Sequence, residues 1–453
     1  MYYWREIIYE DLPFKDNHYI GPYPYHIPSN NEVIGLGYHA KSGLMLTSVG
    51  RLRPGVPSTL NAFCVAHYEK GNSPHLWGFP NYEKNTLNAS FYGEFSIDIR
   101  KLPTEDRKYS AGYYNHFFVG LNQADSKGKT YKDIRKLEEF SIINTYRPIV
   151  DNHCNRLFII DTGVLRYGPS LIYDVQDPAI VVFDLPSNGC DQRRFPLIRR
   201  VEIPKYLWND PAGFSFITLD YSKTGSCEDL LLYIPNLFDH SLTVYDYKRG
   251  SFWSFKDPSM RPILAESSLI FHPNIQYEVQ LGITDVVLGW PDKVGNRNAY
   301  YSPGSSTSEY VVSTKLLKNP RRAYRNNSEE FNLIGFRGCD TQNFHQTIDP
   351  STGVIFFGQM QSKKILCWNT QRHFNPDTIG VIYESDALQF VSEINMDAEG
   401  YLWFHSSHLP LIYLTDDKQL NINDINSRTF RVKASEAIEG TVCDVSDDFK
   451  SIH

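Results

Sequence analysis

The sequence predicts an all-β fold, a six-bladed β-propeller, and three observations support this prediction. Pairs of short β-rich runs, each broken by a turn at Gly, Pro, Asp or Asn, recur six times along the chain. A further short strand precedes each pair. Helical periodicity is nearly absent, apart from a short charged stretch near Lys132 to Phe140. Radial repetition of small sheets explains how so many short strands avoid long exposed edges.

Each pair is expected to form the middle two strands of a four-stranded blade. In chain order the pairs are 44–49 with 62–67, 157–161 with 180–184, 230–234 with 242–246, 299–302 with 310–313, 354–357 with 365–368, and 401–404 with 411–414. The strand before each pair is expected to lie innermost and to line the central channel. These strands are predicted at 33–38, 142–150, 214–219, 282–288, 344–348 and 390–396.

The spacing of the pairs is uneven, and the largest gap falls between the first and the second. We therefore expect one propeller domain over residues 1–453, with a long loop insertion near residues 69–140 over one face. A pair of β-sandwiches is the alternative architecture. The unbroken repetition, with no central linker, argues against it.

Composition narrows the classes of partner. The chain has 453 residues, of which 41% are hydrophobic and 14% aromatic, enough for one large core. Lys and Arg number 45 against 52 Asp and Glu, a net charge of −7, and no basic run could follow a phosphate backbone. No stretch approaches the roughly 18 consecutive apolar residues of a membrane span. We expect neither nucleic acid nor membrane as a partner.

The first residues, Met1-Tyr2-Tyr3-Trp4-Arg5, lack the basic and then apolar pattern of a signal peptide. The protein is therefore either cytosolic or the mature part of a secreted protein preceded by a starter Met, and we favour the second interpretation. Two N-x-S sequons, at Asn88 and Asn326, are candidate glycosylation sites, although about two would arise by chance in such a chain.

The cysteines are widely spaced and form no CxxC pair that would suggest zinc or a redox dithiol. Their number is odd, so at least one thiol stays free. The seven positions are Cys64, Cys154, Cys190, Cys227, Cys339, Cys367 and Cys443.

Four motifs resemble segments of the yellow or major royal jelly protein family. They are RLRPGVPSTLN at 51–61, YRP with CNRLFIIDTG at 146–163, FFG with CWN at 356–369, and ND with FR at 423–431. The resemblance covers nearly the whole chain. In the last third, at 353–357 and 400–404, the sequence is most similar to yellow-related salivary proteins of blood-feeding flies.

The resemblance implies a six-bladed propeller, in agreement with the repeat count, but it implies several functions. Family members include amine-binding salivary proteins, dopachrome-converting enzymes of melanin synthesis, pigmentation factors, and royal jelly proteins that serve as food. Our first hypothesis is a secreted, monomeric protein that binds a small aromatic amine such as serotonin, dopamine or a catecholamine in its channel. The alternatives are a dopachrome-converting enzyme that needs no cofactor, and a structural or nutritive protein.

The resemblance also implies ligand contacts. In the amine-binding relatives they come from the innermost strand of the last blade and from the loop after its second strand, which match Ser392, Ser407 and Leu409. Aromatic residues near the inner strands could stack on a ligand. Ordinary strand serines and core aromatics are the alternative interpretation. The aromatic candidates for ligand contact are Phe344, Phe390 and Tyr301.

A dopachrome tautomerase needs a base and an acid on opposite edges of a flat substrate. Asp161 could be the base, but an Asp before Thr-Gly at a strand end is more often a turn residue. His405 and His408 do not share a strand face, so they are a weak metal signal, and we expect no metal or cofactor. The other candidates at inner-strand ends are His39, Asp151, His153, His272, His345 and His405.

The family resemblance pairs Cys367 with Cys443, and a secreted chain gains stability when its last blade is fastened in this way. For Cys154 the partner is Cys190 or Cys227. Cys227 is favoured because Cys154 and Cys227 each precede the outer-going strand of adjacent repeats.

Overall fold

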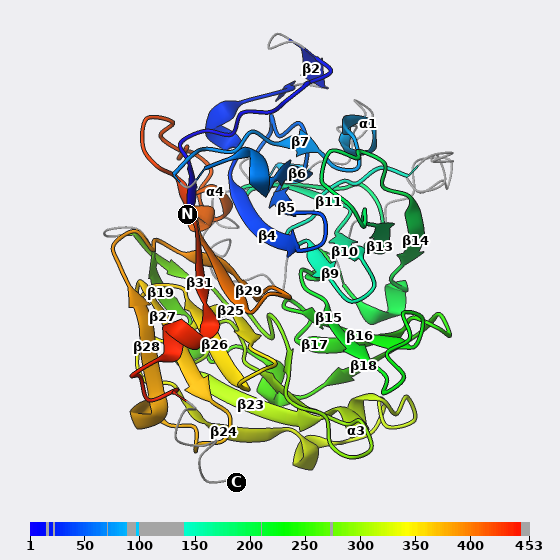
Figure 1. Cartoon of the computed structure of the whole chain (residues 1–453), viewed down its shortest axis with the longest axis vertical. Helices are drawn as coiled ribbons and strands as arrows, with labels where there is room; N and C mark the ends of the chain where they lie inside the picture. Colours follow the sequence, from blue (N-terminus) through cyan, green and yellow to red (C-terminus); the bar gives the residue numbers. More distant parts are fainter. Residues whose placement is uncertain are drawn as a thin grey trace.

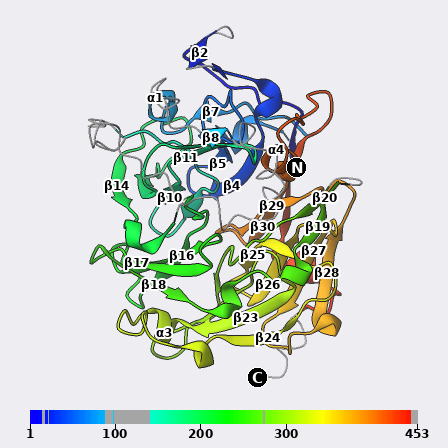
Figure 2. The ribbon, with the colours of Figure 1, turned by 180° about the vertical axis from the view of Figure 1, so that it is seen from behind.

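The computed structural model describes residues 1–14, 18–20, 23–69, 71–87, 97–98, 140–209, 211–271 and 275–444. Six four-stranded antiparallel sheets form a ring, and the chain passes from one to the next around it (Figure 1, and from behind in Figure 2). The predicted all-β, six-bladed propeller is confirmed.

The strands have the order expected within a blade. Innermost lie β4 (Val33–His39), β9 (Ile149–Asp151), β15 (Thr218–Tyr221), β21 (Val287–Leu288), β25 (Asn343–Ile348) and β29 (Val391–Met396). Second are β5 (Leu44–Val49), β10 (Arg156–Asp161), β16 (Leu230–Asn236), β22 (Asn298–Tyr301), β26 (Val354–Gln359) and β30 (Tyr401–Ser406). Third are β6 (Leu60–Cys64), β13 (Ala179–Asp184), β17 (Ser241–Asp246), β23 (Ser308–Ser313), β27 (Lys364–Asn369) and β31 (Ser427–Lys433). Outermost are β7 (Trp77–Gly78), β14 (Leu197–Glu202), β18 (Ser251–Lys256), β24 (Asn332–Phe336), β28 (Ile379–Glu384) and β1 (Tyr2–Trp4).

The N-terminus closes the ring. Strand β1 pairs antiparallel with β31, so the first residues of the chain supply the outermost strand of the last blade. Trp4 is buried there, and its indole Nε1 donates a hydrogen bond to the carbonyl of Pro74 at 2.8 Å. Because this strand is short and distant in sequence from its blade, the repeat pattern did not reveal it.

The third strand of the last blade was predicted wrongly. Residues 411–414 belong to the short helix α4 (Leu409–Leu414), and β31 takes the place of the predicted strand. Pro410 lies in the first turn of α4, where its fixed φ and missing N–H are tolerated. A short apolar run cannot be assigned to strand or helix by its pattern alone, which explains the error.

Smaller strands and helices lie outside the six four-stranded sheets. The hairpins are β2 (Tyr19–Ile20) with β3 (Tyr23–Pro24), and β19 (Ser268–Phe271) with β20 (Ile275–Glu278). A separate sheet contains β8 (Ile97–Asp98), β11 (Val164–Tyr167) and β12 (Leu171–Asp174). The other short α-helices of the described residues are α1 (Tyr82–Asn85), α3 (Thr314–Leu317) and α5 (Ala434–Ile438).

The first part of the region near 69–140, which was predicted to be a loop insertion, belongs to the first blade. It contains β7, the fourth strand of the first blade, and α1. Residues 88–96 and 99–139 lie outside the described residues, and so does the charged stretch near Lys132.

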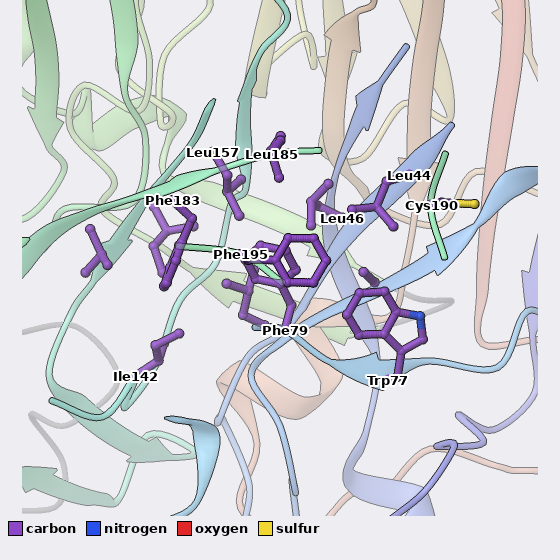
Figure 3. Close-up of a cluster of buried hydrophobic side chains, with 14 of the residues drawn as sticks. Leu44, Leu46, Trp77, Phe79, Ile142, Leu157, Phe183, Leu185, Cys190 and Phe195 are labelled. Atoms are coloured by element: carbon purple, nitrogen blue, oxygen red, sulfur yellow. The ribbon is translucent and has the colours of Figure 1, made fainter. Parts of the chain in front are cut away.

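The core is divided into layers between neighbouring blades, as Figure 3 shows for the first two. Leu44 and Leu46 of β5 face Leu157 of β10, and all three are fully buried. Phe79 packs on Phe195 at a ring-centroid distance of 4.3 Å. Apolar residues on both faces of the middle strands explain why these strands read as nearly continuous hydrophobic runs.

Three disulfides fasten the ring. Cys154 pairs with Cys227 and Cys367 with Cys443, as expected, which excludes Cys190 as the partner of Cys154. Cys190 pairs instead with Cys64, a bridge that the sequence did not predict. Cys339 is free and exposed. Disulfides are typical of proteins from oxidising compartments. Within the described ranges, no helix has the length and apolar character needed to cross a membrane.

Candidate ligand-binding site

One end of the channel contains a cavity of about 110 Å³. All six blades contribute to it, because the starts of the inner strands and the ends of the second strands meet at the same end of a propeller. Ile34, Arg147, Phe214, Leu281, Phe344 and Phe390 come from inner strands or the turns before them. Helix α4, between β30 and β31, covers the cavity with Leu409, Pro410, Tyr413 and Leu414.

The cavity wall is mainly apolar and aromatic. The ring centroids of Phe344 and Phe390 are 5.3 Å apart, and those of Phe390 and Phe271 are 5.6 Å apart in an edge-to-face arrangement. Leu409 lines the same wall. A row of rings of this kind offers faces on which a flat aromatic ligand can stack. The further aromatic residues of the lining are Tyr146, Phe214, Phe238 and Tyr413.

Two guanidinium groups are the only charged groups in the described lining. Arg147 is ion-paired with Glu393, with Nη1 and Oε2 3.4 Å apart, and it donates to the carbonyl of Ser392 at 2.8 Å. Burial raises the pKa of the Glu393 carboxyl to about 7, although Arg147 lowers it. Arg166 lies over the ring of Tyr413, 4.8 Å from its centroid. No Asp or Glu belongs to this described lining.

Two arginines of the motif at 51–61 connect the first blade to α4 and to the second blade at this end of the channel. Arg53 donates to the carbonyls of Ile412 at 3.1 Å, Asp416 at 2.6 Å and Thr415, so it fixes the end of α4 over the cavity. Arg51 is fully buried and donates to the carbonyl of Ile142 at 3.0 Å, which ties the first blade to the second. Buried carbonyl groups need such donors, which explains why the motif needs arginine at both positions.

The predicted contact residues fall in different places. Leu409, Phe344 and Phe390 line the cavity. Ser407 lines a smaller adjoining hollow. Ser392 does not line either space; its hydroxyl is buried and has no hydrogen-bond partner within the described part of the chain.

Tyr301, the third aromatic candidate, does not line the cavity. Its ring packs in the core between the third and fourth blades and stacks on Tyr310 at 5.7 Å. Its hydroxyl lies 2.6 Å from that of Ser259. The side chain is on the second strand of its blade, β22, where both faces are covered by neighbouring sheets, so it is removed from the channel.

Most of the histidine candidates have structural partners. His405 lies between the hydroxyl of Thr429 and the carbonyl of Val33, each at 2.8 Å, and burial lowers its pKa to about 4. His39 contacts the hydroxyl of Ser42 at 2.8 Å, and His153 contacts a loop carbonyl at 2.7 Å. His272 lies outside the described residues.

The two aspartate candidates also organise the backbone. Asp161 accepts hydrogen bonds from the N–H groups of Ile143, Asn144 and Gly163, which agrees with the turn interpretation. Burial raises its pKa. Asp151 accepts from Arg156 at 3.2 Å.

His345 is different, because it is paired with a buried carboxylate. Its Nδ1 lies 2.9 Å from Oδ2 of Asp285, and the same oxygen accepts from the N–H of Gln346 at 2.6 Å. Burial raises the pKa of Asp285 well above its usual value. His345 directly follows the cavity residue Phe344, with their ring centroids 5.5 Å apart, but neither His345 nor Asp285 lines the cavity itself.

One group of potential metal ligands occurs among the described residues, at Cys64, His67, Cys190 and Asp191. The two cysteines form a disulfide, so they do not offer thiolates to a metal. His408, which was considered with His405, lies instead at the start of α4 beside Glu32, whose carboxylate accepts its backbone N–H at 2.5 Å.

Fold and cavity together define a disulfide-fastened six-bladed propeller with a cavity lined by aromatic residues at one end of its channel. The family model "Major royal jelly protein" matches residues 143–443, and the chain belongs to this family.

The relatives include salivary proteins and, by name, one enzyme. The chain is 30% identical to the yellow-related salivary protein SP03 of Phlebotomus perniciosus, over 97% of this chain and 94% of that one. It is 33% identical to the yellow-related salivary protein M35 of Phlebotomus duboscqi, over 74% and 82%. It is 29% identical to the L-dopachrome tautomerase yellow-f of Drosophila melanogaster, over 89% and 80%.

Proposed function

We propose that the protein is a secreted binder of a small aromatic amine, of the serotonin or catecholamine type, and that the ligand occupies the cavity beneath α4. The observation that carries this proposal is the row formed by Phe344, Phe390 and Phe271. Each aromatic face attracts a flat ring or an ammonium group by roughly 0.5 to 2 kcal/mol. The salivary relatives and the three disulfides support secretion.

The charges of the lining suggest one orientation for such a ligand. The guanidinium of Arg166 over Tyr413 makes one end of the cavity positive. An ammonium group is repelled from that end, whereas a phenolic hydroxyl can accept hydrogen bonds there. We therefore place the hydroxyl near Arg166 and the amine near Phe271 and Phe390.

Calorimetric titration with serotonin and dopamine tests this proposal. The variant Phe390→Ala should weaken binding about three- to thirtyfold, the loss of one stacking or cation–π contact. Tyr301→Phe is the matched control, because Tyr301 is an aromatic residue of the core outside the cavity. Failure of the wild-type protein to bind either amine contradicts the proposal.

The positions taken from the amine-binding relatives form a separate test. If the buried hydroxyl of Ser392 contacts the ligand, Ser392→Ala should weaken serotonin binding about three- to tenfold, with little change in thermal stability. Ser407→Asn should tighten binding, because the longer side chain reaches further from the adjoining hollow toward the cavity. Unchanged affinity in both variants places the ligand contacts elsewhere in the lining.

A second candidate function is dopachrome tautomerisation, favoured by the His345–Asp285 pair. An imidazole held by a buried acid can take a proton from carbon and return one, and Arg147 in the lining can hold a carboxylate of the substrate. The rate of dopachrome decay measured with wild type and His345→Gln tests this activity. Decay at the uncatalysed rate with the wild-type protein excludes it.

A further inference from the structure

The cavity adjoins a smaller side chamber, the hollow that Ser407 lines, and the chamber adjoins an outer groove. The chamber, of about 10 Å³, shares Phe271, Phe390 and Pro410 with the cavity. It shares Gln389, His408 and Leu411 with an outer polar groove of about 800 Å³. The three spaces therefore lie next to one another beside α4.

A buried carboxylate lies within hydrogen-bond distance of the chamber wall, although it lines neither the cavity nor the chamber. Glu32 directly precedes β4, on which Ile34 lines the cavity. One of its oxygens, Oε1, accepts the N–H of His408 at 2.5 Å, and His408 lines both the chamber and the groove. Glu32 is 2% exposed, so its carboxylate is almost completely removed from water.

The charge of this carboxylate has little compensation. Oε2 of Glu32 has no hydrogen-bond partner in the described part of the protein. The nearest basic group is the imidazole of His408, with Nδ1 3.9 Å from Oε1. Burial therefore raises the pKa of Glu32 well above its usual value, and only the backbone bond from His408 opposes this. The other buried glutamates of the described residues differ, because Glu309 is paired with Arg337 and Glu393 with Arg147.

A buried carboxyl group without a cationic partner stays protonated, and a cationic ligand beside it favours its charged form. An aromatic amine in the cavity has its ring against Phe344 and Phe390, and its ammonium group is repelled from the Arg166 end. A two-carbon side chain at the Phe390 end extends toward the chamber. An ammonium group there can donate to a carboxylate, which is a strong, charge-assisted hydrogen bond.

We propose that Glu32 is the counter-ion that selects amines in this protein, and that it accepts the ligand's ammonium group beside His408 of the chamber wall. The inference rests on the proposed aromatic-amine function and adds the residue that decides between an amine and a neutral ring. Aromatic compounds that lack the amine retain only the stacking contacts.

The test compares serotonin with 5-hydroxyindole, which has the same ring system and hydroxyl but no aminoethyl group. Wild-type protein should bind serotonin the more tightly. Glu32→Gln keeps the acceptor for the His408 N–H but removes the charge, so serotonin binding should weaken about tenfold or more, and 5-hydroxyindole binding should not change. Glu32→Asp, which keeps the charge, should retain part of the preference for serotonin.

The matched control is Glu202→Gln, the same chemical change on the exposed edge strand β14, which should leave both affinities unchanged. Thermal unfolding of each variant verifies that it is folded. If Glu32→Gln weakens both ligands equally, or leaves serotonin unchanged, the role of Glu32 is overturned. If the wild-type protein binds neither compound, the aromatic-binding function itself fails, and the role of Glu32 fails with it.

Discussion

The most direct structural prediction concerns Arg53, because one side chain holds the helix that covers the cavity. Arg53 is buried and donates to the carbonyls of Ile412, Thr415 and Asp416, with longer contacts to the hydroxyl of Thr415 and the carbonyl of Lys418. The substitution Arg53→Met keeps most of the aliphatic stem but removes every one of these donors.

The expected loss of stability follows from these contacts. Hydrogen bonds from a charged group contribute about 1.5 to 3 kcal/mol each when removed singly, but bonds from one guanidinium are not additive. We expect Arg53→Met to lower the free energy of unfolding by about 3 to 5 kcal/mol, as when one partner is removed from a buried polar network. Arg53→Lys has three donors and should lose about half as much.

Two measurements check this prediction. Denaturant unfolding gives the loss of stability, and calorimetric titration gives the affinity for serotonin. Leu409 and Tyr413 of α4 line the cavity, so loosening the helix should weaken ligand binding as well. Arg193→Met is the control, because Arg193 is a surface residue paired with Glu10 and Asp11, where loss costs about 0 to 1 kcal/mol. Wild-type stability and affinity in Arg53→Met would refute the reasoning.

Three further predictions concern stability and modification. Replacing both Cys64 and Cys190 by Ser opens a loop of 126 residues and should cost about 5 kcal/mol by the chain-entropy estimate, measured by denaturant unfolding. Glu393 has a folded-state pKa of about 7 against 4.5 when unfolded, so stability should fall by about 3 kcal/mol as the pH rises from about 4.5 to 7. Stability measured across that range should vary less in Glu393→Gln, and an equally steep fall contradicts the assignment. Asn326 is exposed in its sequon, and mass spectrometry of protein secreted from insect cells should find a glycan there that Ser328→Ala removes.

The sequence was sufficient for the architecture because each blade repeats the same local pattern. Strand runs such as 354–357 and 365–368 are continuous apolar segments bounded by turns, and they became β26 and β27 with small changes of boundary. The run 411–414 is also a short apolar segment, but it starts after Pro410 and forms a helix. The difference depends on tertiary packing against Leu52, which local pattern does not contain.

The candidate site was only partly accessible to sequence reasoning. Phe344, Phe390 and Leu409 were found because inner strands and the family resemblance both point to that end of the channel. Glu32 and Arg53 were missed, because their partners lie 376 and 359 residues away. The only available signal was the pair of arginines in the motif at 51–61, whose carbonyl partners become visible only in the folded protein. The Cys64–Cys190 bridge was missed for the same reason.

The two candidate functions make opposite demands on the same cavity. An amine needs a negative group near its ammonium end, and Glu32 at the side chamber meets that need. Dopachrome carries a carboxylate and needs positive groups, and Arg147 and Arg166 lie in the lining. Arg147 is ion-paired with Glu393, which offsets its positive charge. Its guanidinium carbon lies 5.0 Å from the ring centroid of Phe344, so the ring covers one face of the group. Arg166 lies on β11, between two strands of the second blade in the chain, whereas the His345–Asp285 pair belongs to the fourth and fifth blades on the other side of the ring. Phe390 of the aromatic row lines the chamber together with His408, whose backbone N–H is bonded to Glu32. On this distribution of charge, binding of an amine is the function that uses more of the residues that the propeller brings together.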